Sequence, residues 1–179
     1  MSGADFIQGY RADFQKNHFQ LFGLPEHYRI DDARIERAFR TLQAQVHPDK
    51  FAHLPESGRR VSMQWSTHVN EAYQILRNPV ARARYLLALH GVDTQEEINT
   101  AMPLDFLMEQ MDLREAVAKA RSDTDPAQLS QMERQLNLEM GELKEKLAVA
   151  LDDTQDYTLA SENVRKLKFM EKQIGRAHV

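Results

Sequence analysis

Apolar residues recur along the chain with the period of an α-helix, and almost no segment shows the strict alternation of a β-strand. Between Asp31 and Val46 apolar residues occur at positions i, i+3, i+4, i+7 and i+11, namely Ile35, Ala38, Phe39, Leu42 and Val46. This spacing predicts a helix with one buried face, and Arg37 and Arg40 lie on the opposite face. The helix must end near His47, because the residue before a proline is disfavoured in the α conformation.

A second amphipathic helix is predicted from Ser57 to Arg77, again with a single apolar stripe. The stripe consists of Val61, Trp65, Val69, Ala72, Tyr73 and Leu76. Because a short loop joins the two long helices, we expect them to lie antiparallel with their stripes in contact. The segment HFQLFGLP, residues 18–25, offers a short apolar helix that could lie across them, ended by Gly23 and Pro25. The sequence therefore predicts a compact three-helix unit with an exposed loop.

Four more helices are predicted in the rest of the chain. The first has Asn78 as its N-cap, Pro79 in its first turn and Gly91 at its end, and residues 93–103 form a loop. The others run from about Leu104 to Ala120, from Pro126 to Leu151 after an Asp125 cap, and from Tyr157 to Ile174 before Gly175. The middle one carries the seam of a helical bundle, made of Leu129, Met132, Leu136, Met140, Leu143, Leu147 and Leu151.

The predicted helix from Leu104 carries more apolar residues than its core stripe needs. A narrow arc suffices for the core: Phe106, Leu113, Val117 and Ala120. The opposite side combines apolar and acidic residues: Leu107, Met108, Met111, Asp112 and Glu115. Exposed methionine and leucine clusters with a polar rim mark partner surfaces. The alternative is that a neighbouring element of the same chain, such as the linker helix, covers these side chains.

The last predicted helix has a similar surplus residue. Its core stripe consists of Tyr157, Ala160, Val164, Leu167, Met170 and Ile174. Phe169 points nearly opposite this stripe, between Arg165 and Lys172, where no core remains for it to enter. We therefore expect Phe169 to belong to the same partner surface.

Composition narrows the class of protein. The chain has 179 residues, of which 42% are hydrophobic and 28% charged, as in soluble globular domains. It has no cysteine, which excludes disulfides, thiolate nucleophiles and cysteine-ligated metal centres, and fits a reducing compartment. No apolar run is long enough to cross a bilayer, and the N-terminus lacks the order of a signal peptide. We expect a cytoplasmic protein without membrane contact.

Charge and histidine spacing disfavour two other classes. The net charge is −4, and up to Ile98 the 12 basic residues are balanced by 12 acidic ones, so a nucleic-acid reader using Arg34, Arg37 and Arg40 is not expected. The seven histidines are scattered, with no His-Glu-x-x-His pair for a metal. No nucleophile or oxyanion donor is identifiable beside His47 and Asp49. The sequence therefore predicts no enzyme, no metal site and no cofactor.

Taken alone, His47-Pro48-Asp49 is a short match in which the proline ends a helix and the aspartate makes a local turn. Five motifs in order make a stronger case: HFQLFGLP (18–25), VHPDKF (46–51), RNPVARARYLLALHG (77–91), FLMEQMDLRE (106–115) and VRKLKFMEK (164–172). They resemble the HscB family, the J-domain co-chaperones of iron–sulfur cluster assembly. The Gly/Phe-rich segment and cysteine-rich zinc module of general DnaJ proteins are absent, as is the tetracysteine module of some HscB relatives.

The resemblance implies an all-α fold with three parts: a J domain with an antiparallel helical hairpin plus a short helix (17–77), a linker helix and loop (78–98), and a C-terminal three-helix bundle (99–179). Residues 1–16 form an N-terminal extension that the family does not explain.

The resemblance also implies two partners. A DnaK-type chaperone similar to HscA would bind His47, Pro48, Asp49, Lys50, Arg37 and Arg40 and be stimulated to hydrolyse ATP. An iron–sulfur scaffold protein similar to IscU would bind Leu107, Met108, Met111, Asp112, Glu115 and Phe169. Without the loop beside them, Arg37 and Arg40 would be read as an ordinary solvated face. The alternative function is a general J-domain co-chaperone with a different client.

Overall fold

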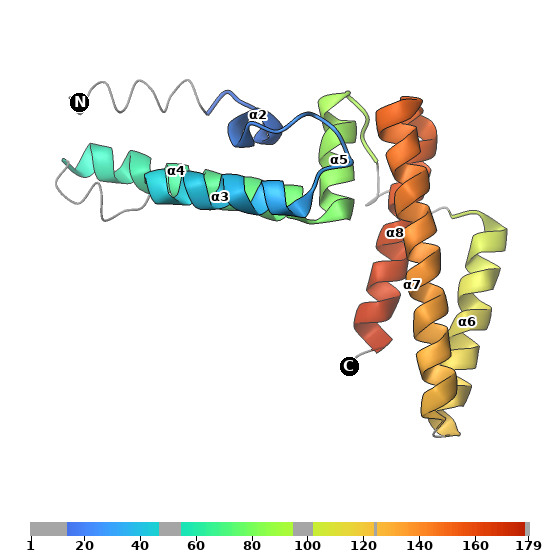
Figure 1. Ribbon diagram of the computed structural model, residues 1–179. Helices are drawn as coiled ribbons and strands as arrows, with labels where there is room; N and C mark the ends of the chain where they lie inside the picture. The colour runs from blue at the N-terminus through green and yellow to red at the C-terminus, as the bar shows by residue number, and fades with distance from the viewer. Residues whose placement is uncertain (1–13, 47–54, 95–101, 124, 178–179) are drawn as a thin grey trace. The chain divides into compact units, whose positions relative to one another are not determined.

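The computed structural model describes residues 14–46, 55–94, 102–123 and 125–177, and all regular secondary structure in these ranges is helical, as predicted. The helices are α2 (His18–Phe22), α3 (Asp32–Val46), α4 (Glu56–Arg77), α5 (Pro79–Leu89), α6 (Leu104–Ser122), α7 (Pro126–Ala148), the π-helical turn η2 (Val149–Asp153) and α8 (Tyr157–Ala177) (Figure 1). Their contacts divide the chain into two compact units, Met1–Leu86 and Leu87–Val179.

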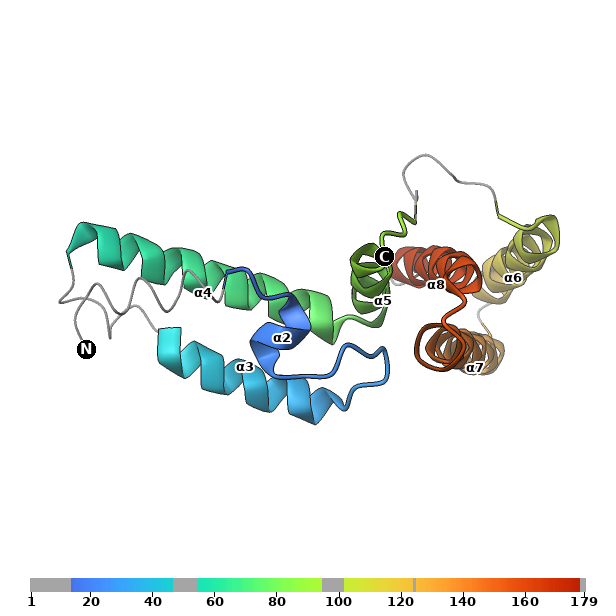
Figure 2. The same ribbon diagram turned by 90° about the horizontal axis from the view of Figure 1, so that it is seen from above.

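The first unit is built on an antiparallel hairpin of α3 and α4, which lie side by side in both views (Figures 1 and 2). The predicted stripe of α4 is buried apart from Val61, which is half-buried, and Trp65 and Val69 are only 2% and 1% exposed. From α3, Ile35 is buried, whereas Ala38, Phe39 and Leu42 are half-buried. The side chain of Val46 lies outside the described part. The predicted hairpin is therefore confirmed.

The short helix α2 packs on both helices of the hairpin. It has only five residues, and hydrogen-bonded caps at both ends stabilise it. At the start, the Asn17 side chain accepts a hydrogen bond from the Gln20 amide at 2.9 Å, and the Gln20 side chain accepts one from the Asn17 amide at 3.2 Å. At the end, Gly23 adopts a left-handed conformation with φ 60°. Between these caps, Phe19, Leu21 and Phe22 are buried.

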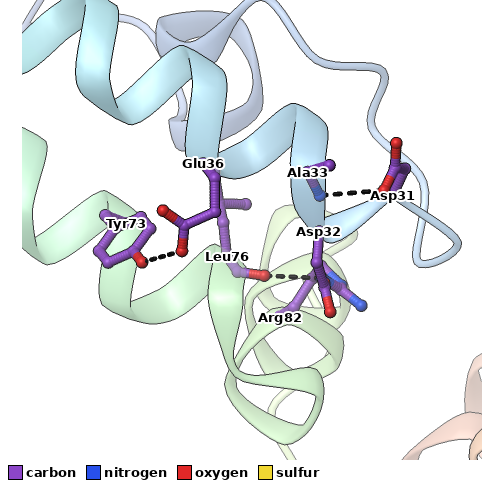
Figure 3. A network of polar contacts seen from close by, with 7 residues as sticks. All are labelled: Asp31, Asp32, Ala33, Glu36, Tyr73, Leu76 and Arg82. Atoms are coloured by element: carbon purple, nitrogen blue, oxygen red, sulfur yellow. Dashed lines mark hydrogen bonds and ion pairs between the residues drawn. The ribbon is translucent and has the colours of Figure 1, made fainter.

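A buried arginine joins the start of α5 to the hairpin (Figure 3). Arg82 is only 6% exposed, and its Nη1 donates a hydrogen bond of 2.7 Å to the carbonyl oxygen of Leu76 in the last turn of α4. Its guanidinium also lies 3.9 Å from the Asp32 carboxylate and 5.2 Å from the centre of the Tyr28 ring. The last four carbonyls of a helix have no partner within that helix, so Arg82 completes the end of α4.

We expect Arg82→Met to lower the free energy of unfolding by about 1.5–3 kcal/mol, because a charge-assisted hydrogen bond is lost while the apolar stem is kept. Arg84→Met is the matched control: Arg84 lies on the same helix but is exposed, so its substitution should change stability by less than about 0.5 kcal/mol. Urea denaturation of both variants measures the difference. Equal midpoints for the two would contradict this role of Arg82.

The second unit contains a three-helix bundle of α6, α7 and α8 (Figure 2). Its most buried side chains are Ala120, Leu147, Ala150, Ala160, Val164, Leu167 and Met170. The predicted seam of α7 is buried only in its C-terminal part, at Met140, Leu147 and Leu151, whereas Leu129, Met132, Leu136 and Leu143 are half-buried. Figure 1 shows that α8 ends before it reaches the N-terminal turns of α7, along which α6 is the neighbouring described helix.

Two predicted helix ends in this unit are wrong. The α-helix predicted to reach Leu151 ends at Ala148 and continues as the π-helical turn, in which the Thr154 amide donates to the Val149 carbonyl at 2.9 Å. The last helix, predicted to stop before Gly175, continues to Ala177. A glycine inside a helix costs only about 1 kcal/mol, which is not enough to end it.

Candidate binding surfaces

The outer face of α3 presents arginines because its inner face is fixed against α4. The Phe39 ring stacks on the Tyr73 ring with 4.0 Å between centroids, and the Tyr73 hydroxyl donates a short hydrogen bond to the Glu36 carboxylate. This hydrogen bond, supported by burial, raises the pKa of Tyr73 above its usual value. With Ile35, Glu36 and Phe39 held inward, Arg34, Arg37 and Arg40 are exposed.

The arginine face is open to solvent and only weakly paired. The Arg37 guanidinium lies 4.0 Å from the Asp31 carboxylate, and both side chains are more than 60% exposed, at 69% and 62%. An exposed pair at this distance contributes little to stability and is screened by salt. Arg37 and Arg40 are therefore available to an acidic partner, as the sequence suggested. His47, Pro48, Asp49 and Lys50, which complete the predicted chaperone site, lie outside the described residues.

The predicted scaffold face on α6 is exposed at its centre. Met108 and Met111 are 55% and 61% exposed, and Asp112 and Glu115 are exposed beside them. Leu107, at the border of this face, is half-buried. We call Leu104, Leu107, Met108 and Met111 the α6 apolar face. No other helix in the described part of the chain exposes so many large apolar side chains on one side.

Leu104 was not among the predicted site residues, yet at 70% it is the most exposed large apolar residue in the described ranges. It begins α6 and precedes Met108 by four positions and Met111 by seven, so it lies on the same side of the helix. The helical period that identified the two methionines was therefore sufficient to find it.

A buried polar residue of α6 was also missed. Gln110 is only 7% exposed and lies among the apolar residues of the inner stripe, although it was not predicted to be part of the core.

Phe169 was expected to have no packing neighbour within the chain, but it has one in the structure. Its side chain is half-buried, and its ring makes an edge contact with the Phe106 ring of α6, with 5.8 Å between centroids. The ammonium group of Lys166 lies 5.8 Å from the same Phe106 ring. The prediction was wrong because α8 packs against neighbours on more than one side, so a residue opposite its main stripe still meets α6. Its role in partner binding remains a prediction.

The described residues contain neither a candidate metal site nor a candidate membrane-spanning helix. These ranges contain no group of three or more histidine, aspartate or glutamate side chains placed to hold a metal ion. His90, one of the seven histidines, instead stacks on the Tyr157 ring with 4.5 Å between centroids. None of the described helices is long and apolar enough to span a membrane.

Comparison with known proteins identifies both units. Residues 17–85 match the DnaJ domain family, and residues 102–176 match the family described as the HSCB C-terminal oligomerisation domain. The co-chaperone protein HscB homolog of Azoarcus sp. (strain BH72) is 50% identical over 160 residues, which cover 89% of this chain and 90% of that protein. The chain belongs to the HscB family. The homolog from Chromobacterium violaceum is 49% identical over 168 residues, covering 92% of this chain and 95% of its own length.

Solved structures of the HscB family agree with this assignment. Chaperone HscB from Vibrio cholerae has a TM-score of 0.84 and 35% sequence identity, over 90% of this chain and 96% of that one. The crystal structure of human co-chaperone protein HscB has a TM-score of 0.85 and 27% identity, over 92% of this chain and 81% of that one. The predicted family and fold, a J domain followed by a C-terminal helical domain, are confirmed.

Proposed function

We propose that this chain is an adaptor in iron–sulfur cluster assembly, which binds a scaffold protein of the IscU type and delivers it to a DnaK-type chaperone of the HscA type. His47, Pro48, Asp49 and Lys50 stimulate the chaperone's ATP hydrolysis, and Arg37 and Arg40 dock it. The α6 apolar face, with Asp112, Glu115 and Phe169, binds the scaffold. The chain itself catalyses no reaction, and the cluster is cargo of the scaffold.

The α6 apolar face is the observation that carries the proposal. Leu104, Met108 and Met111 are each more than half exposed on a helix whose other side is buried. Covering such side chains is favourable by about 25 cal/mol per Å² of apolar area removed from water. The acidic residues beside them favour a partner with an apolar pocket and a basic rim. A J-domain protein with a second, separate binding face is equipped to join a client to its chaperone.

The proposal is tested with purified components. The chain is added to a DnaK-type chaperone in an ATPase assay, with and without the scaffold, and scaffold binding is measured separately by calorimetry. We expect direct scaffold binding and a larger stimulation when the scaffold is present. Stimulation of the chaperone without any scaffold binding would instead support a general J-domain co-chaperone with a different client.

Reversing both docking arginines, Arg37→Glu and Arg40→Glu, should weaken the chaperone contact mainly by slowing association. Raising the salt concentration should shrink the difference between variant and wild type, because exposed charges are screened beyond about 10 Å at 0.1 M salt. Scaffold affinity should not change. Association rates measured by surface plasmon resonance at two salt concentrations provide the check, and an equal loss of binding to both partners would indicate misfolding instead.

A further inference from the structure

Two histidines face each other in the first unit, inside a cluster of aromatic rings. His18 of α2 and His68 of α4 have 5.5 Å between ring centroids. The His18 ring stacks on the Tyr85 ring of α5 at 4.3 Å, and the Tyr85 hydroxyl accepts a hydrogen bond of 3.1 Å from the His18 amide. The site therefore joins α2, α4 and α5. Its polar groups play no part in the two binding surfaces described above.

Phe14 extends this cluster into the segment before α2. The Phe14 ring makes an edge contact with the Trp65 ring at 4.8 Å and lies 5.6 Å from the His68 ring. Trp65 is 2% exposed, whereas Phe14 is 38% exposed and forms the outer layer over it. We call Phe14, His18, Trp65, His68 and Tyr85 the aromatic latch. It explains part of the N-terminal extension, for which the sequence indicated no role.

Within the described residues, the latch offers no hydrogen-bond partner to His18 Nδ1 or His68 Nε2. Both atoms are buried. A neutral imidazole can leave one bare nitrogen in such a place at moderate cost, but an imidazolium carries an N–H at both positions. Protonating His18 therefore buries an N–H without an acceptor among the described residues, next to the His68 ring.

The charged and titratable groups around His18 act in both directions. Burial lowers the pKa of His18 below its usual value, and the neighbouring His68 of α4 lowers it further. Glu71, also from α4, acts in the opposite direction and raises it. The α5 side contributes the neutral phenol of Tyr85, and no charged residue from the described part of α3 contributes to the shift. The net effect is a lowered pKa, which favours the neutral form of the His18 imidazole.

We propose that His18, packed against His68, is the pH-sensitive element of the aromatic latch, which holds residues 14–18 on α4 and α5 while the His18 ring is neutral and releases them when it is protonated. A histidine whose pKa is lowered by folding contributes stability above its unfolded pKa of about 6.5. This contribution is lost as the pH falls below that value. Acidification then separates Phe14 from Trp65 and admits water to the indole.

The single tryptophan of the chain makes the latch directly observable. Between about pH 8 and about pH 5, we expect the Trp65 emission of the full chain to move to longer wavelength and the urea midpoint to fall. In His68→Gln, the ring that lowers the pKa of His18 is gone, so the pKa of His18 measured by NMR should rise toward its usual value. The emission change of this variant should be smaller than that of the wild type.

His27→Gln is the matched control, because His27 is an exposed histidine of the same unit and should leave the wild-type profile unchanged. The wild-type NMR titration of His18 needs no variant and keeps the test valid if a substitution destabilises the fold. The latch is refuted if the pKa of His18 is the same in wild type and His68→Gln. It is equally refuted if Trp65 emission stays constant over the pH range in the wild type.

Discussion

Replacing Met108 and Met111 together by alanine should lower scaffold affinity by at least about tenfold without loss of folding stability. Each exposed methionine contributes apolar area that is buried only in the complex, worth about 1–3 kcal/mol for a well-buried anchor. Alanine is also the better helix former, so the exposed side of α6 tolerates the change. Calorimetric titration with the scaffold and a urea denaturation curve measure the two effects.

Two controls separate partner binding from packing. Leu147→Ala removes a side chain with 0% exposure, so it should cost about 2–5 kcal/mol of unfolding free energy. Leu138→Ala removes an apolar side chain that is 64% exposed on α7 and does not belong to the α6 apolar face, so it should change neither quantity. If Leu138→Ala weakens the scaffold complex as much as the methionine variant, binding does not depend on the α6 apolar face.

His47→Gln should abolish stimulation of the chaperone's ATPase while the chain keeps its fold and its scaffold affinity. The proposed contact needs an imidazole donor next to the Asp49 acceptor and the rigid Pro48, and the glutamine side chain does not reproduce this geometry. Because the proposed role of His47 lies in the contact with the chaperone, its substitution should change the free energy of unfolding by less than about 0.5 kcal/mol. Steady-state ATPase rates at saturating scaffold concentration test the prediction.

The matched control for this loop is His53→Gln, a second histidine within the same inter-helix segment. It should stimulate like the wild type, because it is not part of the His-Pro-Asp motif. Normal stimulation by His47→Gln would remove the loop from the proposed mechanism. Loss of stimulation by both variants would show that the whole segment matters, rather than the three motif residues.

Helical periodicity predicted most of the secondary structure, because each helix buries one side against its neighbours. The buried positions Trp65, Val69 and Leu76 on α4, and Val164, Leu167 and Met170 on α8, all follow from this single rule. The exposed pair Met108 and Met111 follows from the same rule, as the residues that the core stripe of α6 does not need. Leu104 was within reach of the same reasoning, since it is one turn earlier on that side.

The sequence by itself determined the helices, the family motifs and the exposed methionines of α6, because these depend on residue spacing along one element. Only the tertiary structure decided which residues from different elements meet. It placed Phe169 against Phe106, buried the Arg82 guanidinium at the end of α4, and brought His18, His68 and Phe14 into one cluster. These contacts join residues on different elements, so they depend on how helices pack, which no pattern within a single helix contains.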